Sequence, residues 1–331
     1  YRYRILVCVT ILQALMNPIA SLVLIRINGG TAMMRILGIV GVQVCICVPI
    51  IVFQFCKGKE FFSKEYWGYA LRIGIPIVPH YLSGIILNQG DRIMIDKMVG
   101  KTEVALYGLA YSIGMLVQLF ISGMNSALTP WMYSKIKKGD IRSMRKVLQL
   151  LSIVVVGIAV ALMLISPELV LIFGSPKYRE AVYVIPPVAA SVFFIFIYNI
   201  LSMPQFYYEK TQFLMAASMA AAGANVVLNF IFIRLFGYIA AGYTTLACYM
   251  LYSVGHYIVS KRILVNEGIQ ENLMNPGFLL ACSVFLIGAS IICNLIFPYR
   301  ILRYAILLAS AGLVFWKKEL LLKTMADIRK K

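Results

Sequence analysis

Ten apolar runs of about twenty residues each follow one another along almost the whole chain, and this pattern limits the possible folds most strongly. A helix needs about 20 mostly apolar residues to cross a hydrocarbon core about 30 Å thick. The segments between the runs are too short to form a soluble domain. The sequence therefore predicts an all-α polytopic membrane protein with about ten transmembrane helices, near residues 5–25, 33–55, 73–98, 104–128, 148–173, 181–203, 210–233, 238–259, 277–296 and 299–316.

The positive charges predict how these helices are oriented. The chain is 61% hydrophobic and 13% charged, with a formal net charge of +18. If the first run starts in the cytoplasm, about two thirds of the 31 Lys and Arg residues fall in cytoplasmic segments. By the positive-inside rule, both termini of this chain are then predicted to be cytoplasmic. Because topology accounts for the excess charge, we expect no nucleic-acid partner.

The seven cysteines do not indicate a disulfide framework or a metal site. All of them lie in or at the ends of apolar runs, their number is odd, and none has the spacing of metal ligands. Buried free cysteines commonly act as small hydrophobic residues. We therefore expect no metal and no cofactor.

The polar segments also differ between the two predicted sides. The longest ones, over residues 56–72, 133–146 and 260–276, all fall on the cytoplasmic side. The first is rich in aromatic residues, which favours an amphipathic helix in the headgroup region. The outer connections are short, which argues against a membrane glycosyltransferase or polymerase, because such an enzyme needs an outer loop that carries catalytic carboxylates.

Several predicted helices carry polar side chains at helical spacing. In the first run, for example, Thr10, Gln13, Asn17 and Ser21 follow one another by three or four residues. One interpretation is a set of helix–helix seams, in which small and polar residues bond to neighbouring helices. The other is a shared polar cavity, because a lipid-facing helix surface has no use for polar groups. The residues predicted to line such a substrate pathway from the fourth to the eighth run are Tyr111, Gln118, Asn125, Tyr198, Asn225, Asn229, Tyr249 and His256.

The third run contains several ionisable side chains, which are costly inside a bilayer and often functional. Arg92 and Asp96 have the i, i+4 spacing of an ion pair. A second face carries His80, Asn88 and Asp91. We predict that His80, Asn88 and Arg92 belong to the substrate pathway and that Asp91, Arg92 and Asp96 take part in ion pairing or cation coupling. The alternative is a structural ion cluster near the outer end of the helix.

An ordered series of motifs resembles the Wzx-type polysaccharide repeat-unit flippases. The motifs are Ile75-Pro76-Ile77-Val78-Pro79, Asp91-Arg92-Ile93-Met94-Ile95, Glu103-Val104-Ala105-Leu106-Tyr107, Ser166-Pro167-Glu168, Glu209-Lys210-Thr211 and Asn225-Val226-Val227-Leu228-Asn229. These flippases belong to the multidrug/oligosaccharidyl-lipid/polysaccharide transporter superfamily. The resemblance implies two six-helix lobes and a terminal hairpin, fourteen helices in all, of which the first four would be absent here. Residues 1–60 would then complete an N-terminal lobe, 61–265 would form the C-terminal lobe, and 266–331 would form the hairpin and a basic cytoplasmic tail.

The function that this resemblance implies is transport without chemistry, so we expect no enzyme. The substrate would be an undecaprenyl-diphosphate-linked oligosaccharide, moved across the bacterial cytoplasmic membrane by alternating access for capsule or O-antigen export. The expected partners are this lipid-linked oligosaccharide, membrane lipids, H⁺ or Na⁺ as a coupling ion, and the polysaccharide polymerase machinery. The alternatives are a multidrug or peptidoglycan-precursor transporter of the same superfamily and, from another class, the membrane glycosyltransferase or polymerase.

Overall fold

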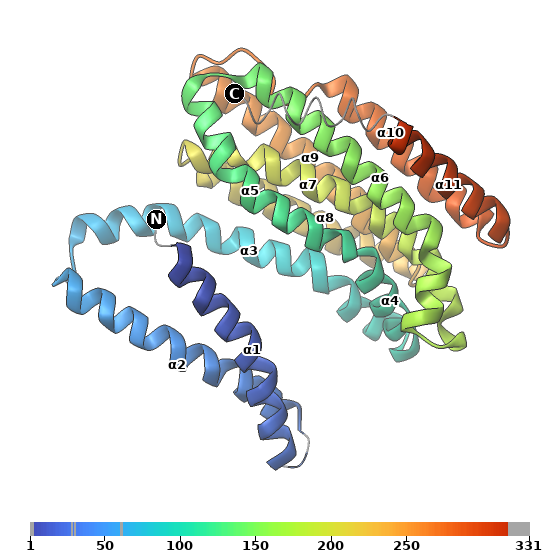
Figure 1. The fold of residues 1–331 in the computed structure, drawn as a ribbon, viewed down its shortest axis with the longest axis horizontal. Helices are drawn as coiled ribbons and strands as arrows, with labels where there is room; N and C mark the ends of the chain where they lie inside the picture. The colour runs from blue at the N-terminus through green and yellow to red at the C-terminus, as the bar shows by residue number, and fades with distance from the viewer. Residues whose placement is uncertain (1–2, 28, 30, 60–61, 317–331) are drawn as a thin grey trace. The chain divides into compact units, whose positions relative to one another are not determined.

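The computed structural model describes residues 3–27, 29, 31–59 and 62–316, in which all regular structure is helical (Figure 1). The predicted basic tail over 317–331 lies outside these residues. The helices are α1 (Tyr3–Ile27), α2 (Ala32–Gly58), α3 (Lys64–Met98), α4 (Lys101–Gly114), α5 (Leu116–Lys138), α6 (Ile141–Phe173), the 3₁₀ segment η1 (Pro176–Val184), α7 (Ile185–Tyr207), α8 (Thr211–Phe236), α9 (Ala240–Asn266), α10 (Pro276–Ile296) and α11 (Arg300–Trp316).

The predicted all-α membrane fold is confirmed. Each of the ten apolar runs lies in helical structure, and within the described residues eight segments are long and apolar enough to cross a membrane. The two runs outside this group form α9 and α11. The polar residues along α9 lower its hydropathy, although most of them are buried within the protein. Helix α11 is only 17 residues long.

Three local features differ from the simplest expectation. The run over 104–128 is interrupted at Met115, which separates α4 from α5. The segment over 56–72 forms no separate amphipathic helix in its described part, because α2 continues to Gly58 and residues 64–72 are the first turns of α3. Helix α3 is therefore 35 residues long, and it continues through Pro76 and Pro79 without a break.

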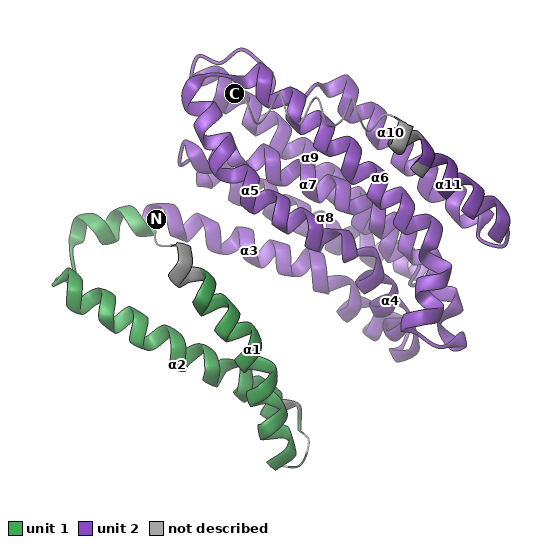
Figure 2. Cartoon of the chain, in the orientation of Figure 1, with its two compact units in different colours: residues 1–71 green, residues 72–331 purple. Residues whose placement is uncertain are grey.

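The chain divides into two compact units, residues 1–71 and 72–331, with the division inside α3 (Figure 2). In the first unit α1 packs on α2. Their backbones come close together, because a Cβ on Gly38 would lie 2.6 Å from the Cα of Ser21. Gln13 Nε2 also lies 3.7 Å from Cys47 Sγ. Gln13 and Ser21, two members of the polar stripe in the first run, therefore contribute to a seam between α1 and α2.

Helix α7 is the centre of the second unit. Its sequence is apolar over most of its circumference, which is typical of a helix enclosed by other helices, and most of its residues are buried. It packs most extensively on α9 and also contacts α5, α6 and α10. Helix α8 packs on α9, while α11 packs on α6. This arrangement places the polar faces of α3, α4, α8 and α9 near one another.

Candidate functional site

A cavity of about 760 Å³ lies in the second unit between α3, α4, α5, α7 and α9. Many of its lining side chains are tyrosines, amides or hydroxyl residues. The structure brings six of the eleven predicted substrate-pathway residues together around this cavity, and their role in transport stays a prediction. They are His80, Asn88, Tyr111, Gln118, Tyr198 and Tyr249.

Aromatic rings form one wall of the cavity. Tyr198 of α7 stacks on Tyr249 of α9 with ring centroids 6.3 Å apart and an interplanar angle of 8°. Tyr252, one turn further along α9, lies 4.5 Å from Tyr198 by ring centroid. Its hydroxyl is 3.0 Å from His80 Nδ1. A tyrosine presents both an apolar ring and a polar hydroxyl, so this wall offers stacking surfaces and hydrogen-bonding groups side by side.

Asn88 connects three helices at the edge of the cavity. Its Oδ1 accepts a hydrogen bond from the Tyr111 hydroxyl of α4 at 2.7 Å and another from the Tyr249 hydroxyl of α9 at 3.3 Å. Its Nδ2 donates to the Gly84 carbonyl of its own helix at 2.7 Å. The Asn88 side chain is therefore fixed in orientation, with its carbonyl oxygen shared between two tyrosines.

Asp91 lies three residues further along α3 and is completely buried. Its Oδ2 accepts from the Tyr107 hydroxyl at 2.5 Å and from Thr245 Oγ1 at 2.6 Å. Its Oδ1 accepts from Asn229 Nδ2 at 2.5 Å. Four helices, α3, α4, α8 and α9, thus meet at one carboxylate.

Among the described residues, the surroundings of Asp91 contain oxygen atoms but no cationic side chain that forms an ion pair with it. Asn229 Oδ1 accepts from Thr244 Oγ1, and Asn225 Oδ1 accepts from Asn229 Nδ2 at 3.2 Å. None of the ion pairs between described residues includes Asp91. The described residues also hold no cluster of three or more His, Cys, Asp or Glu side chains that could bind a metal. A buried carboxylate without a countercharge is costly unless it binds a proton or a cation.

The ion pair that the i, i+4 spacing favours between Arg92 and Asp96 is not among the ion pairs of the described residues. Asp96 is exposed on the surface of this unit. Arg92 Nη1 instead donates to Gln89 Oε1 at 2.9 Å, and its guanidinium lies 5.3 Å from the ring centroid of Tyr111. Because Gln89 and Tyr111 both line the cavity, Arg92 is held at its rim.

The other predicted pathway residues lie away from the cavity lining. His256 is completely buried behind Tyr252, with ring centroids 4.5 Å apart, and its Nδ1 is 2.8 Å from Gln205 Nε2. Asn225 and Asn229 belong to the surroundings of Asp91. Asn125 of α5 is half-buried and its Oδ1 has no hydrogen-bond partner in the structure.

The selection of site residues from the sequence omitted four important side chains: Tyr107, Thr244 and Thr245 around Asp91, and Tyr252 in the cavity wall. A signal existed for three of them. Tyr107 occurs in the same polar stripe as Tyr111, and Thr245 and Tyr252 in the same stripe as Tyr249. Thr244 has no such signal, because it lies beside the stripe and reaches the site through Asn229.

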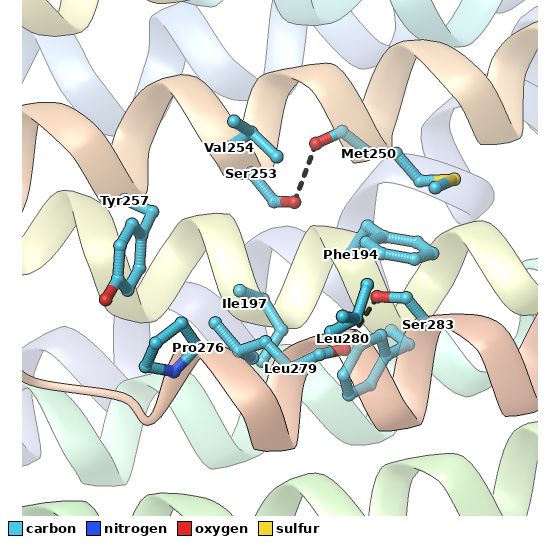
Figure 3. A pocket seen from close by; sticks show the side chains of 11 residues that line it. Phe194, Ile197, Met250, Ser253, Val254, Tyr257, Pro276, Leu279, Leu280 and Ser283 are labelled. Carbon is cyan, nitrogen blue, oxygen red and sulfur yellow. Dashed lines mark hydrogen bonds between the residues drawn. The ribbon is translucent and has the colours of Figure 1, made fainter.

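A second cavity, of about 270 Å³, lies between α7, α9 and α10 and is almost entirely apolar (Figure 3). Its two serine hydroxyls bond to backbone carbonyls of their own helices. Ser253 Oγ donates to the Met250 carbonyl and Ser283 Oγ to the Leu279 carbonyl. This cavity can therefore accommodate apolar groups, whereas the cavity beside Asn88 is lined by polar groups.

A helical unit with membrane-spanning segments, a polar cavity and a buried acid beside it has the features of a membrane transporter. The family described as "Polysaccharide biosynthesis protein" matches residues 2–137, and the family described as "MatE" matches residues 76–231. Each match covers less than half of this chain, and both support the resemblance of its motifs to the multidrug/oligosaccharidyl-lipid/polysaccharide transporter superfamily.

Two curated relatives come from Haemophilus influenzae strain Rd. A protein of the Lsg locus is 28% identical over 172 residues, which are 49% of this chain and 41% of that protein. An uncharacterized membrane protein is 29% identical over 191 residues, 54% of this chain and 46% of that protein. The chain thus spans less than half the length of the curated relatives that it matches. No solved structure matches the chain significantly.

Proposed function

We propose that this protein is a flippase that moves undecaprenyl-diphosphate-linked oligosaccharide repeat units across the bacterial cytoplasmic membrane for cell-surface polysaccharide export, such as that of capsule or O-antigen. The observation that carries the proposal is the polar cavity lined by tyrosines and amides inside a membrane-spanning unit. Tyrosine rings pack on the apolar faces of sugar rings, while amides and hydroxyls bind sugar hydroxyls. The match of residues 2–137 to the family described as "Polysaccharide biosynthesis protein" supports the same class of substrate.

The physical task of a flippase is to replace water around a polar headgroup. Sugars and a diphosphate that enter hydrocarbon without partners lose their hydrogen bonds at a cost of several kcal/mol for each group. A lined cavity supplies those bonds, while the lipid tail stays in the bilayer. Alternating access, in which the two lobes of the full-length transporter rock against each other, then exposes the cavity to one leaflet at a time. No bond is made or broken, so the proposed protein is not an enzyme.

The proposal extends to the energy source. Asp91 and the oxygens of Asn225 and Thr245 are oxygen ligands of the kind that bind a small hard cation, and the carboxylate alone can bind a proton. We therefore assign H⁺ or Na⁺ coupling to Asp91 rather than to Asp96, which is exposed. Arg92, held at the rim of the cavity, is the proposed contact for an anionic group of the substrate.

The alternatives find less support in the cavity. A multidrug exporter favours an apolar, acid-lined cavity, whereas no Asp or Glu lines this one. A peptidoglycan-precursor flippase would use the same physics and differs only in the glycan. In the proposed topology both termini of this chain are cytoplasmic, and any contact with the polymerase machinery occurs outside the cavity.

The test uses the full-length protein in its native host. After depletion, an impermeant sugar oxidant such as periodate reports which leaflet holds the lipid-linked oligosaccharide. We expect accumulation in the inner leaflet, restored by the wild type and by Asp96→Asn but not by Asp91→Asn or Arg92→Ala at equal expression. Accumulation in the outer leaflet would contradict flipping. Full rescue by Asp91→Asn would leave flipping intact and would remove the assigned coupling site.

A further inference from the structure

Two hydrogen-bonded layers, one helical turn apart, connect the same three helices. The buried layer consists of Asp91, Tyr107 and Thr245, and the cavity layer consists of Asn88, Tyr111 and Tyr249. In each layer α3 supplies the acceptor, α4 a tyrosine hydroxyl, and α9 a hydroxyl. On each helix, the residue of one layer is separated from the residue of the other by three positions on α3 and by four on α4 and α9. These separations correspond to about 4.5–6 Å along the helix axes.

The two layers differ in what reaches them. All three residues of the cavity layer line the polar cavity, so a bound sugar hydroxyl competes for the Asn88 carbonyl or for the tyrosine hydroxyls that it holds. Asp91 is fully buried and is reached by the proposed coupling ion instead. The layers are also in mechanical contact, because the rings of Tyr107 and Tyr111 lie 5.7 Å apart by centroid.

We propose that Asn88 is the positioning residue that couples occupancy of the Asp91 site to the state of the substrate cavity. This inference rests on the proposed function. A cation or proton at Asp91 competes with the hydroxyls of Tyr107 and Thr245 for the carboxylate oxygens. Displacement of the Tyr107 and Thr245 hydroxyls moves α4 and α9 relative to α3. Tyr111 and Tyr249 lie on the same two helices and bond to Asn88, so this movement changes the contacts of Asn88. Such coupling is reciprocal, so a ligand at Asn88 changes ion affinity by the same factor.

Among the charged and titratable groups in this region, Asp91 is the one that we expect to bind the coupling ion. Tyr107 and Tyr111 from α4 and Tyr249 and Cys248 from α9 interact electrostatically with it. Helix α8 contributes the two neutral amides of Asn225 and Asn229. Arg92 on α3 itself faces the Tyr111 ring. Removal of the Asp91 charge should therefore abolish ion binding while the aromatic hydroxyls are retained.

A cysteine in the cavity reports the coupling without a need for the natural substrate. Leu119 lines the cavity on α5, outside both layers, and is 76% exposed on this unit. In the full-length protein with its native cysteines replaced, we would measure how fast Leu119→Cys is alkylated in detergent. One series varies NaCl against choline chloride and the other varies pH, which separates Na⁺ from H⁺. We expect the rate to change about fivefold or more with the coupling ion, as is typical of coupled sites, and Asp91→Asn to remove the change.

Asn88→Leu is the decisive variant, with Gln118→Leu as a matched control because Gln118 lines the cavity outside the layers. We expect Asn88→Leu to abolish the ion dependence of alkylation while the ion still raises the melting temperature by mass action. A merely structural role would lower the melting temperature at every ion concentration and leave the dependence intact. Persistence of the dependence in Asn88→Leu refutes the role of Asn88. If alkylation of the Leu119→Cys protein does not depend on the ion, the coupling site is refuted and this inference with it. The same holds if Asp91→Asn leaves the ion dependence of alkylation unchanged.

Discussion

A bidentate ion pair links α11 to α6, while α10 packs on α6 and α7. Arg303, in the first turn of α11, donates from Nη1 and Nη2 to the two carboxylate oxygens of Glu168 on α6, both at 2.8 Å. Nη1 also donates to the Leu164 carbonyl at 2.7 Å. The Arg303 side chain is only 4% exposed and that of Glu168 is 25% exposed. Bidentate geometry and burial make this pair much stronger than a surface ion pair.

We predict that Glu168→Gln loosens α11. Loss of one partner of a fully buried ion pair costs about 3–5 kcal/mol, because the remaining charge is uncompensated. Water reaches the partly exposed side of Glu168, which reduces the expected cost to about 2–4 kcal/mol. Since 1.4 kcal/mol is a factor of ten, local opening of α11 should increase roughly 30- to 1000-fold. Hydrogen exchange of the α11 amides in detergent measures this change directly.

The chain supplies a matched control in Arg300, whose Nε lies 4.0 Å from the same carboxylate and whose side chain is 72% exposed. Arg300→Gln should change the protection of α11 far less than Glu168→Gln, as is usual for surface pairs. The double variant Glu168→Gln with Arg303→Met should recover most of the protection, because no buried charge remains. Equal effects of Glu168→Gln and Arg300→Gln, or no recovery in the double variant, would refute the argument.

Three further substitutions test the packing of the second unit. Tyr107→Phe removes a donor from the buried carboxylate and should cost about 1.5–3 kcal/mol in a detergent unfolding titration, whereas Tyr81→Phe on the exposed side should have little effect. Gly114→Ala should destabilise by about 1–3 kcal/mol because its Cβ would lie 2.7 Å from a valine methyl of α7, while Gly123→Ala, with open space around it, should have no such effect. Asn275→Ala removes the side-chain acceptor that caps α10 and should lower stability by about 1 kcal/mol, seen as faster hydrogen exchange in its first turn.

Local patterns predicted the helices well because a bilayer requires backbone hydrogen bonds to be satisfied within each span. Helical spacing also grouped Tyr249 with Tyr252 on one face of α9, and both line the cavity. Tyr111 and Gln118 line it too, but from α4 and α5 rather than from one continuous helix. The break at Met115 could not be predicted, because the approach of α7 to Gly114 depends on tertiary packing.

The partners of ionisable groups were harder to predict than their positions. Spacing alone paired Arg92 with Asp96. In the folded chain, however, the Arg92 guanidinium donates to Gln89 and lies over the Tyr111 ring. Asp91 was recognised as a candidate, but its donors come from α4, α8 and α9, which are separated from it by up to 154 positions in the sequence. Sequence periodicity describes one helix at a time and contains no information on which helices meet.

Buried Asp91 and partly buried Glu168 illustrate two physical solutions to the same problem. Glu168 is neutralised by a guanidinium in bidentate contact, so its environment has one favourable charge state and holds two helices together. Asp91 has three neutral donors and no cationic partner among the described residues, so its environment tolerates more than one charge state. Only the second arrangement can take up and release an ion without breaking a salt bridge. This difference, rather than burial alone, is why we place coupling at Asp91 and assign Glu168 a structural role.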